Sequence, residues 1–303
     1  MKINIIILGS LSLLFQYPLF SQVNMSDYTA HQNDTAIVMD SAKFLIELDA
    51  AIHAIAFNHK NKLYVGGKNK VYSIDNDNNI KTYATLTDTT NKTVIWGMTF
   101  DSNGNLFIAA HDRIVRIDTL GTPLTLIQED FKGPCGVSDV RIDSANNLYI
   151  VYDNIIARYD TGLNKKIVVN GNDFNPTIKW AVGIEFDVNN EYIFVGDCNG
   201  KKLFIIPYKS NNYVDESKVI PSNWGQYLTK DEHENIYLSM HGPETFPEFL
   251  IVDRNLKKKE IYLHNRPYQT EGIYKKAIAY GQHGSYEKGI YCIIGNKVYV
   301  YPI

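Results

Sequence analysis

Residues 97–118 read GMTFDSNGNLFIAAHDRIVRID, and similar stretches recur along the chain. Each stretch has a short apolar strand ending in an acidic or amide residue, a turn, a second strand, a polar gap and a third strand. Other copies include AIAFNHKNKLYVGGKNKVYSID at 54–75 and DVRIDSANNLYIVYDNIIARYD at 139–160. Self-similarity at a fixed period of this length is the sequence signature of repeat architectures, propellers among them.

Six copies are present, and one apolar residue in the second strand marks each of them: Leu63, Leu106, Leu148, Ile193, Ile236 and Ile290. The first five markers are 42 to 45 residues apart, and an insertion around 264–276 lengthens the last interval to 54. Short apolar runs bounded by Asn, Gly and Asp predict strands and hairpins. A fourth, more polar strand follows each of the first five copies. The sequence therefore predicts an all-β fold, a six-bladed β-propeller of four-stranded blades.

The sixth copy ends at Ile303 without a fourth strand of its own, while the segment KFLIELD at 43–49 precedes the first copy. We expect this segment to be the outer strand of the last blade, because closing the ring in this way leaves no strand unpaired. The predicted organisation is a signal peptide at 1–22, a polar leader at 23–42 and the propeller at 43–303.

The N-terminus has the layout of a secretory signal: Lys2, an apolar run at 5–15, and Ser21 at a cleavage point. The apolar run is shorter than the roughly 20 residues of a membrane span. We therefore expect a secreted or periplasmic monomer with no membrane span after signal removal. The formal charge of −3, with both signs mixed along the chain, gives no basis for nucleic-acid binding. The expected partners are a small molecule, a peptide or an extracellular protein.

Two rings of residues are expected at one mouth of the central channel. The inner ring directly precedes each first strand and holds His53, Trp96, Ser138, Val182, Gln226 and Lys276. The second ring directly follows each second strand and includes His111, Asp153, Asp197 and His241. Apolar walls with a few polar groups suit a ligand pocket; the alternative is that these side chains only plug the channel. The candidate ligand-binding residues are His53, Trp96, Asp153, Trp180, Asp197, Trp224 and Gln226.

Catalysis at this mouth would need other residues. His53, His111 and His241 are candidate metal ligands, since three imidazoles with an open position make a catalytic zinc site. The candidate catalytic residues are His111, His241 and Glu244, the last as a general base on a long loop. For Asp153 and Asp197, an Asx-turn cap is the structural alternative.

Three cysteines are present: Cys135, Cys198 and Cys292. The odd number leaves at least one thiol unpaired in a monomer. Cys135 and Cys198 are expected on neighbouring blades near the same mouth, and the sequence leaves open whether they form a disulfide.

The stretches GMTFDSNGNLFIAA and FVGDCNGKKLFII resemble the NHL repeat and the related repeats of the gluconolactonase and senescence-marker family, over about residues 43–303. The resemblance implies a six-bladed propeller. Lactonases of that family bind one divalent cation, often calcium, at the channel mouth. The positions that match three of their metal ligands hold His53, Val182 and Gln226 here, and a valine side chain cannot ligate a metal. NHL propellers also include a peptide-amidating lyase with histidine-bound zinc.

Three hypotheses follow. In the first, the chain is a secreted binding propeller with a Trp/His-lined mouth and no cofactor. In the second, it is a metal-dependent hydrolase or lyase, with zinc or calcium, that acts at the same mouth. In the third, it is an extracellular module that binds its partner through the rim. The sequence leaves open whether the protein is an enzyme.

Overall fold

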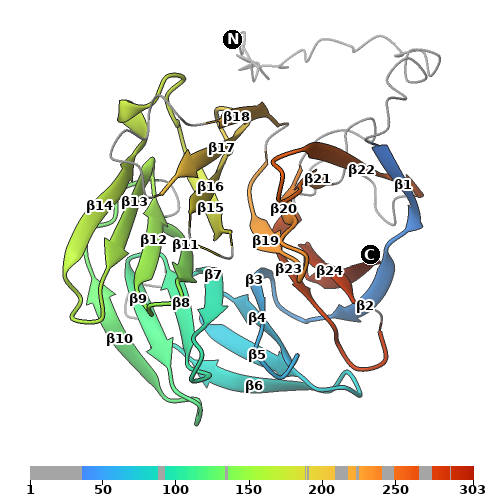
Figure 1. Ribbon diagram of the computed structural model, residues 1–303. Helices are drawn as coiled ribbons and strands as arrows, with labels where there is room; N and C mark the ends of the chain where they lie inside the picture. Colours follow the sequence, from blue (N-terminus) through green and yellow to red (C-terminus); the bar gives the residue numbers. More distant parts are fainter. Residues whose placement is uncertain are drawn as a thin grey trace, which may run out of the picture. The chain divides into compact units, whose positions relative to one another are not determined.

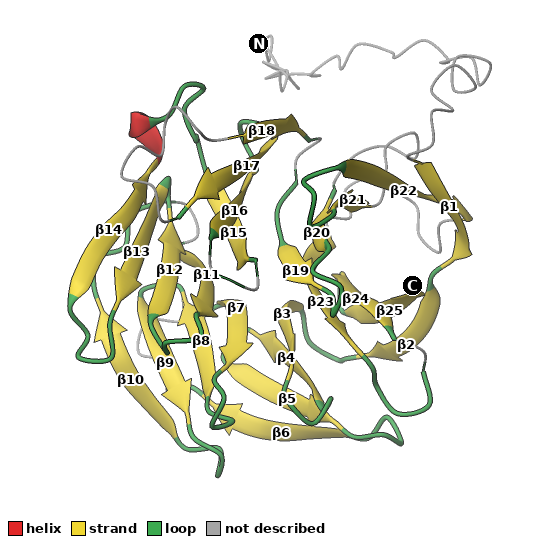
Figure 2. Cartoon of the chain, viewed as in Figure 1, coloured by secondary structure: helices red, strands yellow, loops and turns green. Residues whose placement is uncertain are grey.

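The computed structural model describes residues 36–87, 93–133, 136–187, 189, 191–208, 218–222, 225–240, 249–265, 275–286 and 288–303. From β1 onwards, these residues form six sheets arranged as the blades of a propeller (Figures 1 and 2). The predicted all-β, six-bladed fold is therefore confirmed. Among the described residues, no helix is long and apolar enough to cross a membrane.

Within a blade, consecutive strands pair antiparallel from the channel outwards. Blades 1 and 2 consist of β3 (Ile52–Phe57), β4 (Leu63–Gly67), β5 (Lys70–Ile74), β6 (Ile80–Thr85), and β7 (Ile95–Phe100), β8 (Leu106–Ala110), β9 (Arg113–Ile117), β10 (Pro123–Gln128). Blades 3 and 4 consist of β11 (Val137–Ile142), β12 (Leu148–Tyr152), β13 (Ile155–Tyr159), β14 (Lys165–Asn170), and β15 (Ala181–Phe186), β16 (Tyr192–Asp197), β17 (Lys202–Pro207), β18 (Lys218–Pro221). A 3₁₀ turn, Gly171–Asp173, follows β14. Blades 5 and 6 consist of β19 (Leu228–Lys230), β20 (Ile236–Ser239), β21 (Phe249–Val252), β22 (Lys258–Asn265), and β23 (Lys275–Gly281), β24 (Gly289–Ile294), β25 (Lys297–Pro302) with β2 (Lys43–Glu47).

Two strands near the N-terminus join the last two blades. Strand β2 pairs antiparallel with β25 and is the outer strand of blade 6. Strand β1 (Ala36–Ser41) pairs parallel with β22 and adds a fifth strand to blade 5. Strand β1 was not predicted from the sequence, although AIVMDS contains β-branched residues that favour strands. The predicted signal peptide and most of the predicted leader lie outside the described residues.

The core lies between neighbouring blades rather than in one central layer. On β8, Leu106, Ile108 and Ala110 pack in a cluster with residues of blade 1. The alternate residues, Phe107 and Ala109, pack instead in a cluster with residues of blade 3. Successive side chains of a strand point to opposite faces, so a strand covered on both faces is apolar throughout. This is why the second strands read as unbroken hydrophobic runs.

Acidic or amide residues that follow first and third strands of the blades cap the turns that come next. Asp101 accepts hydrogen bonds from the backbone N–H groups of Asn103 and Asn105, at 3.0 and 2.8 Å. Gly104, inside this turn, has a φ of +84°, which glycine adopts without strain. The same pair of bonds, to positions two and four residues on, recurs at Asn58, Asp75, Asp118, Asp143, Asp160, Asp231 and Asp253.

These capped turns predict a specific loss of stability in acid. Hydrogen bonds from Asn79, Thr122 and Asn164 hold the pKa of Asp75, Asp118 and Asp160, respectively, below the usual 3.8. A lowered folded-state pKa stabilises the fold above the unfolded-state pKa, and this stabilisation is lost as the pH falls through the folded-state pKa. We therefore expect the Tm of the wild type to fall below about pH 4.

The matched variant replaces Asp75, Asp118 and Asp160 together with asparagine, which keeps one acceptor oxygen but does not titrate. Asn58 shows that asparagine caps this turn. Thermal unfolding followed by circular dichroism between pH 2 and pH 7 should give a shallower decline in Tm for the variant. The same decline in both proteins would contradict a role for these carboxylates.

Candidate functional site

Five of the six inner strands carry an irregularity near the channel mouth. In β3 the register against the second strand shifts between Ile52 and Ala54, and β7, β11 and β15 shift at the equivalent position. In β23 the shift lies between Lys275 and Ile278. The residues inside the first four shifts are His53, Trp96, Ser138 and Val182, all members of the predicted inner ring. Bulges of this kind redirect side chains and are frequent beside functional sites.

His53 and Trp96 form an aromatic pair at this mouth. Their ring centroids are 5.0 Å apart and their planes meet at 64°, an edge-to-face arrangement. Both side chains are half-buried. The indole Nε1 of Trp96 is buried and has no hydrogen-bond partner among the described residues. The mouth therefore presents an aromatic wall with one unused hydrogen-bond donor.

Trp96 also lines a small cavity on the channel axis. The cavity has room for about one water molecule and has one polar side, made by Asp139 and Arg141. Its other lining residues are Ala54, Ile55, Gly97, Met98, Tyr227, Ala277 and Ile278. Pockets that enclose a drug-sized ligand measure about 300–1,000 Å³. This cavity is far smaller, so a ligand would lie in the mouth beside it rather than inside it.

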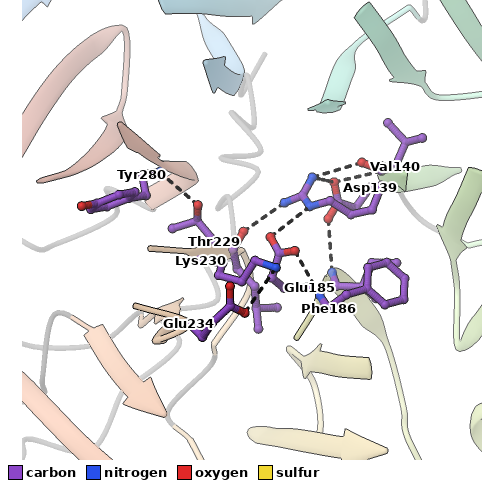
Figure 3. A network of polar contacts seen from close by, with 11 residues as sticks. Asp139, Val140, Glu185, Phe186, Thr229, Lys230, Glu234 and Tyr280 are labelled. Carbon is purple, nitrogen blue, oxygen red and sulfur yellow. Dashed lines mark hydrogen bonds and ion pairs between the residues drawn. The ribbon is translucent and has the colours of Figure 1, made fainter. Parts of the chain in front are cut away.

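Charged and polar groups from several blades form a network of contacts (Figure 3), and two of its members, Asp139 and Arg141, line the cavity. The Asp139 carboxylate accepts hydrogen bonds from Arg141 Nη1 at 2.8 Å, from Val140 N at 2.9 Å and from Ile184 N at 3.2 Å. Burial raises the pKa of Asp139 to about 6, although the Arg141 guanidinium opposes this shift. The carboxyl group thus depends on its arginine to stay ionised at neutral pH.

Arg141 connects three blades. From β11 its Nη2 donates to the carbonyl oxygen of Leu228 on β19, at 2.9 Å, and its Nε lies 3.6 Å from Glu185 Oε2 on β15. On β19, Lys230 is paired with Glu234 at 3.5 Å. The charges of this network, among the described residues, therefore come from blades 3, 4 and 5.

Sequence reasoning missed this network, because it considered only the positions just outside the strands. The signal was present in the repeat alignment: Asp139 stands where four of the five other copies hold a small residue, namely Ala54, Gly97, Gly183 and Ala277. Arg141 and Glu185 likewise occupy a position that is Ala56 in the first copy. A charge on a strand position that is small in the sister repeats was the available clue.

Two of the predicted ligand-binding residues, Asp197 and Trp180, make contacts within the fold. The Asp197 carboxylate is fully buried and accepts from the N–H groups of Lys179, Trp180 and Gly200, at 3.1, 3.0 and 2.9 Å. This is a capping role, the structural alternative considered for Asp197. The Trp180 side chain is half-buried and packs against the hydrophobic core.

The second-ring residues His111 and Asp153 occupy equivalent hairpin turns. Both have a positive φ of 52°. The carbonyl oxygen of His111 accepts from Val137 N at 2.7 Å, and that of Asp153 from Ala181 N at 2.8 Å. Each backbone therefore ties its turn to the first strand of the next blade. Their side chains are half-buried.

Gln226 and Cys198 contact each other at the mouth, where the Gln226 amide donates to Cys198 Sγ at 3.2 Å. Burial raises the pKa of the Cys198 thiol, which disfavours the reactive thiolate. Cys198 and Cys292 are both buried. Cys135, Trp224, His241 and Glu244 lie outside the described residues.

Solved structures match this chain in fold. Virginiamycin B lyase from Staphylococcus aureus is 14% identical with a TM-score of 0.61, over 86% of this chain and 98% of that one. A streptogramin B lyase is 15% identical with a TM-score of 0.58, over 85% and 95%. A gluconolactonase from Xanthomonas campestris is 12% identical with a TM-score of 0.65, over 86% and 88%. This chain shares their six-bladed fold. The resemblance to gluconolactonase propellers is thus confirmed at the level of the fold. No protein-family model and no curated protein matches the sequence.

The metal expected of a lactonase does not fit the described residues. At the three matching positions, Val182 is buried and apolar, and the Gln226 amide is engaged by Cys198. His53 is a nitrogen ligand, whereas calcium prefers carboxylate and carbonyl oxygens. Among the residues that the structure describes, no group of three His, Cys, Asp or Glu side chains is placed to hold a metal ion.

Proposed function

We propose that this chain is an exported binding propeller, which holds a small molecule or peptide at the mouth formed by His53 and Trp96. The observation that carries the proposal concerns Trp96, which lines the axial cavity and whose buried indole Nε1 has no acceptor among the described residues. A buried donor left unpaired costs about 1–3 kcal/mol. A ligand that brings a carbonyl or hydroxyl oxygen to this N–H removes that cost.

The polar groups beside the cavity favour binding over acid–base chemistry. Asp139 is hydrogen-bonded through both oxygens, and Arg141 is engaged by Asp139, Leu228 and Glu185. A general base must lie within hydrogen-bond distance of the proton that it removes from the substrate. These side chains already bond to protein groups, so they form a polar wall of the cavity rather than exchange protons with a substrate. They also keep the inner end of the cavity polar.

The second candidate is a metal-dependent hydrolase or lyase acting at the same mouth. The observation that favours it is the fold, which the chain shares with a gluconolactonase and with streptogramin lyases. His53, His111 and His241 would be the metal-binding residues, with Glu244 as general base.

The test uses the mature chain, starting at residue 23, and two probes suggested by the matched structures: quinupristin, which a catalytically inactive virginiamycin B lyase holds, and glucono-1,5-lactone. Isothermal titration calorimetry should show binding without turnover. Trp96→Phe keeps an aromatic ring and removes the N–H, so the affinity should fall about 5- to 100-fold. Trp180→Phe, the matched control, should change the affinity less because its ring packs against the core.

Equal affinity of the wild type and the Trp96→Phe variant would contradict the binding proposal. Turnover abolished by a chelator, with about one equivalent of divalent metal per chain by elemental mass spectrometry, would establish the second candidate instead.

A further inference from the structure

A cluster of three aromatic rings surrounds a lysine ammonium between blades 2 and 3. Lys165 Nζ lies 5.4 Å from the ring centroid of Tyr152, 5.6 Å from that of Tyr159 and 6.0 Å from that of Phe131. The rings of Phe131 and Tyr152 also contact each other, with centroids 5.1 Å apart. Phe131, Tyr152 and Tyr159 are each less than a tenth exposed. These rings form a cage for a cation, since ring faces attract an ammonium within about 6 Å.

A carboxylate completes the cage. Glu129, just after β10, accepts from Lys165 Nζ at 2.5 Å through Oε2 and from the Tyr159 hydroxyl at 2.8 Å through Oε1. Burial alone would lower the pKa of Lys165, but the bonds to Glu129 and Tyr159 raise it above its usual value. The cage thus stabilises the charged form of the amine.

Lys165 occupies this cage, and its side chain can move out of it. Its side chain is about one-third exposed, at 34%, whereas the rings beneath it are buried. Lys165 is the first residue of β14, so its side chain lies at the end of an outer strand rather than inside a sheet. Rotation about its side-chain bonds would expose the cage without disturbing the strand pairing.

We propose that the cage of Glu129, Phe131, Tyr152 and Tyr159 is a binding site for primary alkylammonium groups, in which Lys165 is a built-in competitor. The site is separate from the channel mouth and does not depend on the function proposed there. Glu129 selects a primary ammonium over a quaternary one, because its oxygen accepts a hydrogen bond that only an N–H can donate.

Lys165 determines how strongly an external amine binds. A group on the same chain competes at a high effective concentration, so the wild type should bind free amines weakly. Removing the Lys165 ammonium while keeping the side-chain length should expose the site at full affinity.

The experiment compares the wild type, Lys165→Met and Lys166→Met by ligand-observed NMR, with n-butylammonium chloride as the probe. Lys166 is the matched control: it is exposed, and its position alternates to the opposite face of the sheet, where it pairs with Arg158. Lys165→Met should bind the probe about tenfold more tightly than the wild type, and Lys166→Met should match the wild type. Tetramethylammonium should bind Lys165→Met more weakly than n-butylammonium does.

Equal binding by the wild type and a folded Lys165→Met variant would overturn the proposal and leave the lysine as a clamp between two blades. Tighter binding of tetramethylammonium than of n-butylammonium would overturn the assignment to primary amines. If Lys165→Met fails to fold, the test becomes Tyr152→Leu, which should abolish the weak binding of n-butylammonium by the wild type at high probe concentration; unchanged binding would again refute the site.

Discussion

Replacing Arg141 with methionine is expected to lower the free energy of unfolding by about 3–5 kcal/mol at pH 7, because it leaves a buried carboxylate without its cation. Asp139 is only 1% exposed and is held by Arg141 at 2.8 Å. Methionine preserves much of the side-chain volume, so the loss would come mainly from charge and hydrogen bonding. A domain of this kind is stable by about 5–15 kcal/mol, so the variant should remain measurable in urea.

The destabilisation should depend on pH in a defined direction. The pKa of Asp139 is already raised to about 6 with Arg141 present, and removing the cation raises it further. A carboxyl whose folded-state pKa exceeds its unfolded-state pKa gains stability as the pH falls between the two values. The difference in stability between the variant and the wild type should therefore be smaller at pH 5 than at pH 7.

Two further variants complete the test. Asp139→Asn in the Arg141→Met background removes the buried charge and should recover part of the lost stability at pH 7. Arg254→Met, at an exposed turn position, should change the stability by no more than about 0.5 kcal/mol. Equal losses for Arg141→Met and Arg254→Met, or a loss that does not vary with pH, would refute the role given to the Asp139–Arg141 pair.

The blades could be predicted from the sequence because their determinants are local. Each hairpin closes within a few residues, and the aspartate that caps the turn stands next to the strand that it ends, as Asp101 does after β7. The apolar second strands follow from burial on both faces, so their positions also appear in the pattern. Strand β1 has no such local signal, because its partner is β22, more than 200 residues later in the chain.

The site was less predictable because its contacts join blades. Arg141 reaches Leu228, 87 residues away, and Asp139 reaches Ile184, 45 residues away. In the sequence, each of these charges is an isolated polar residue in an apolar strand. The inner ring, by contrast, was found because the repeat places a bulge at the same position of several blades, which brought out His53 and Trp96. What these two residues bind stays a prediction.

The N-terminal strands make the second large prediction. A chain that starts at residue 50 lacks β1 and β2 and should lose most of its stability. The removed segment includes Ala42, Leu45, Ile46 and Leu48, all buried in the core cluster shared with blade 6. Each of the three larger side chains contributes about 1.5–3 kcal/mol on burial, which together is comparable to the whole stability of a domain.

The backbone of this segment is also bound to blade 6. Leu48 N donates to Asn296 O at 3.0 Å, and the Asn296 side-chain amide donates to Leu48 O at 2.7 Å. A chain that starts at residue 42 keeps these bonds and loses only β1, so its Tm should lie much closer to that of the chain starting at residue 23. Thermal unfolding of the three chains, followed by circular dichroism, measures the difference.

Complementation separates a missing strand from general damage. A synthetic peptide of residues 42–50 should raise the Tm of the chain that starts at residue 50, and the rise should grow with the logarithm of the peptide concentration above its Kd. A peptide with Leu45, Ile46 and Leu48 replaced by serine should not, because it keeps the backbone groups but buries no apolar surface. If the chain starting at residue 50 unfolded at the same temperature as the chain starting at residue 23, blade 6 would be complete with three strands and β2 would be dispensable for the ring.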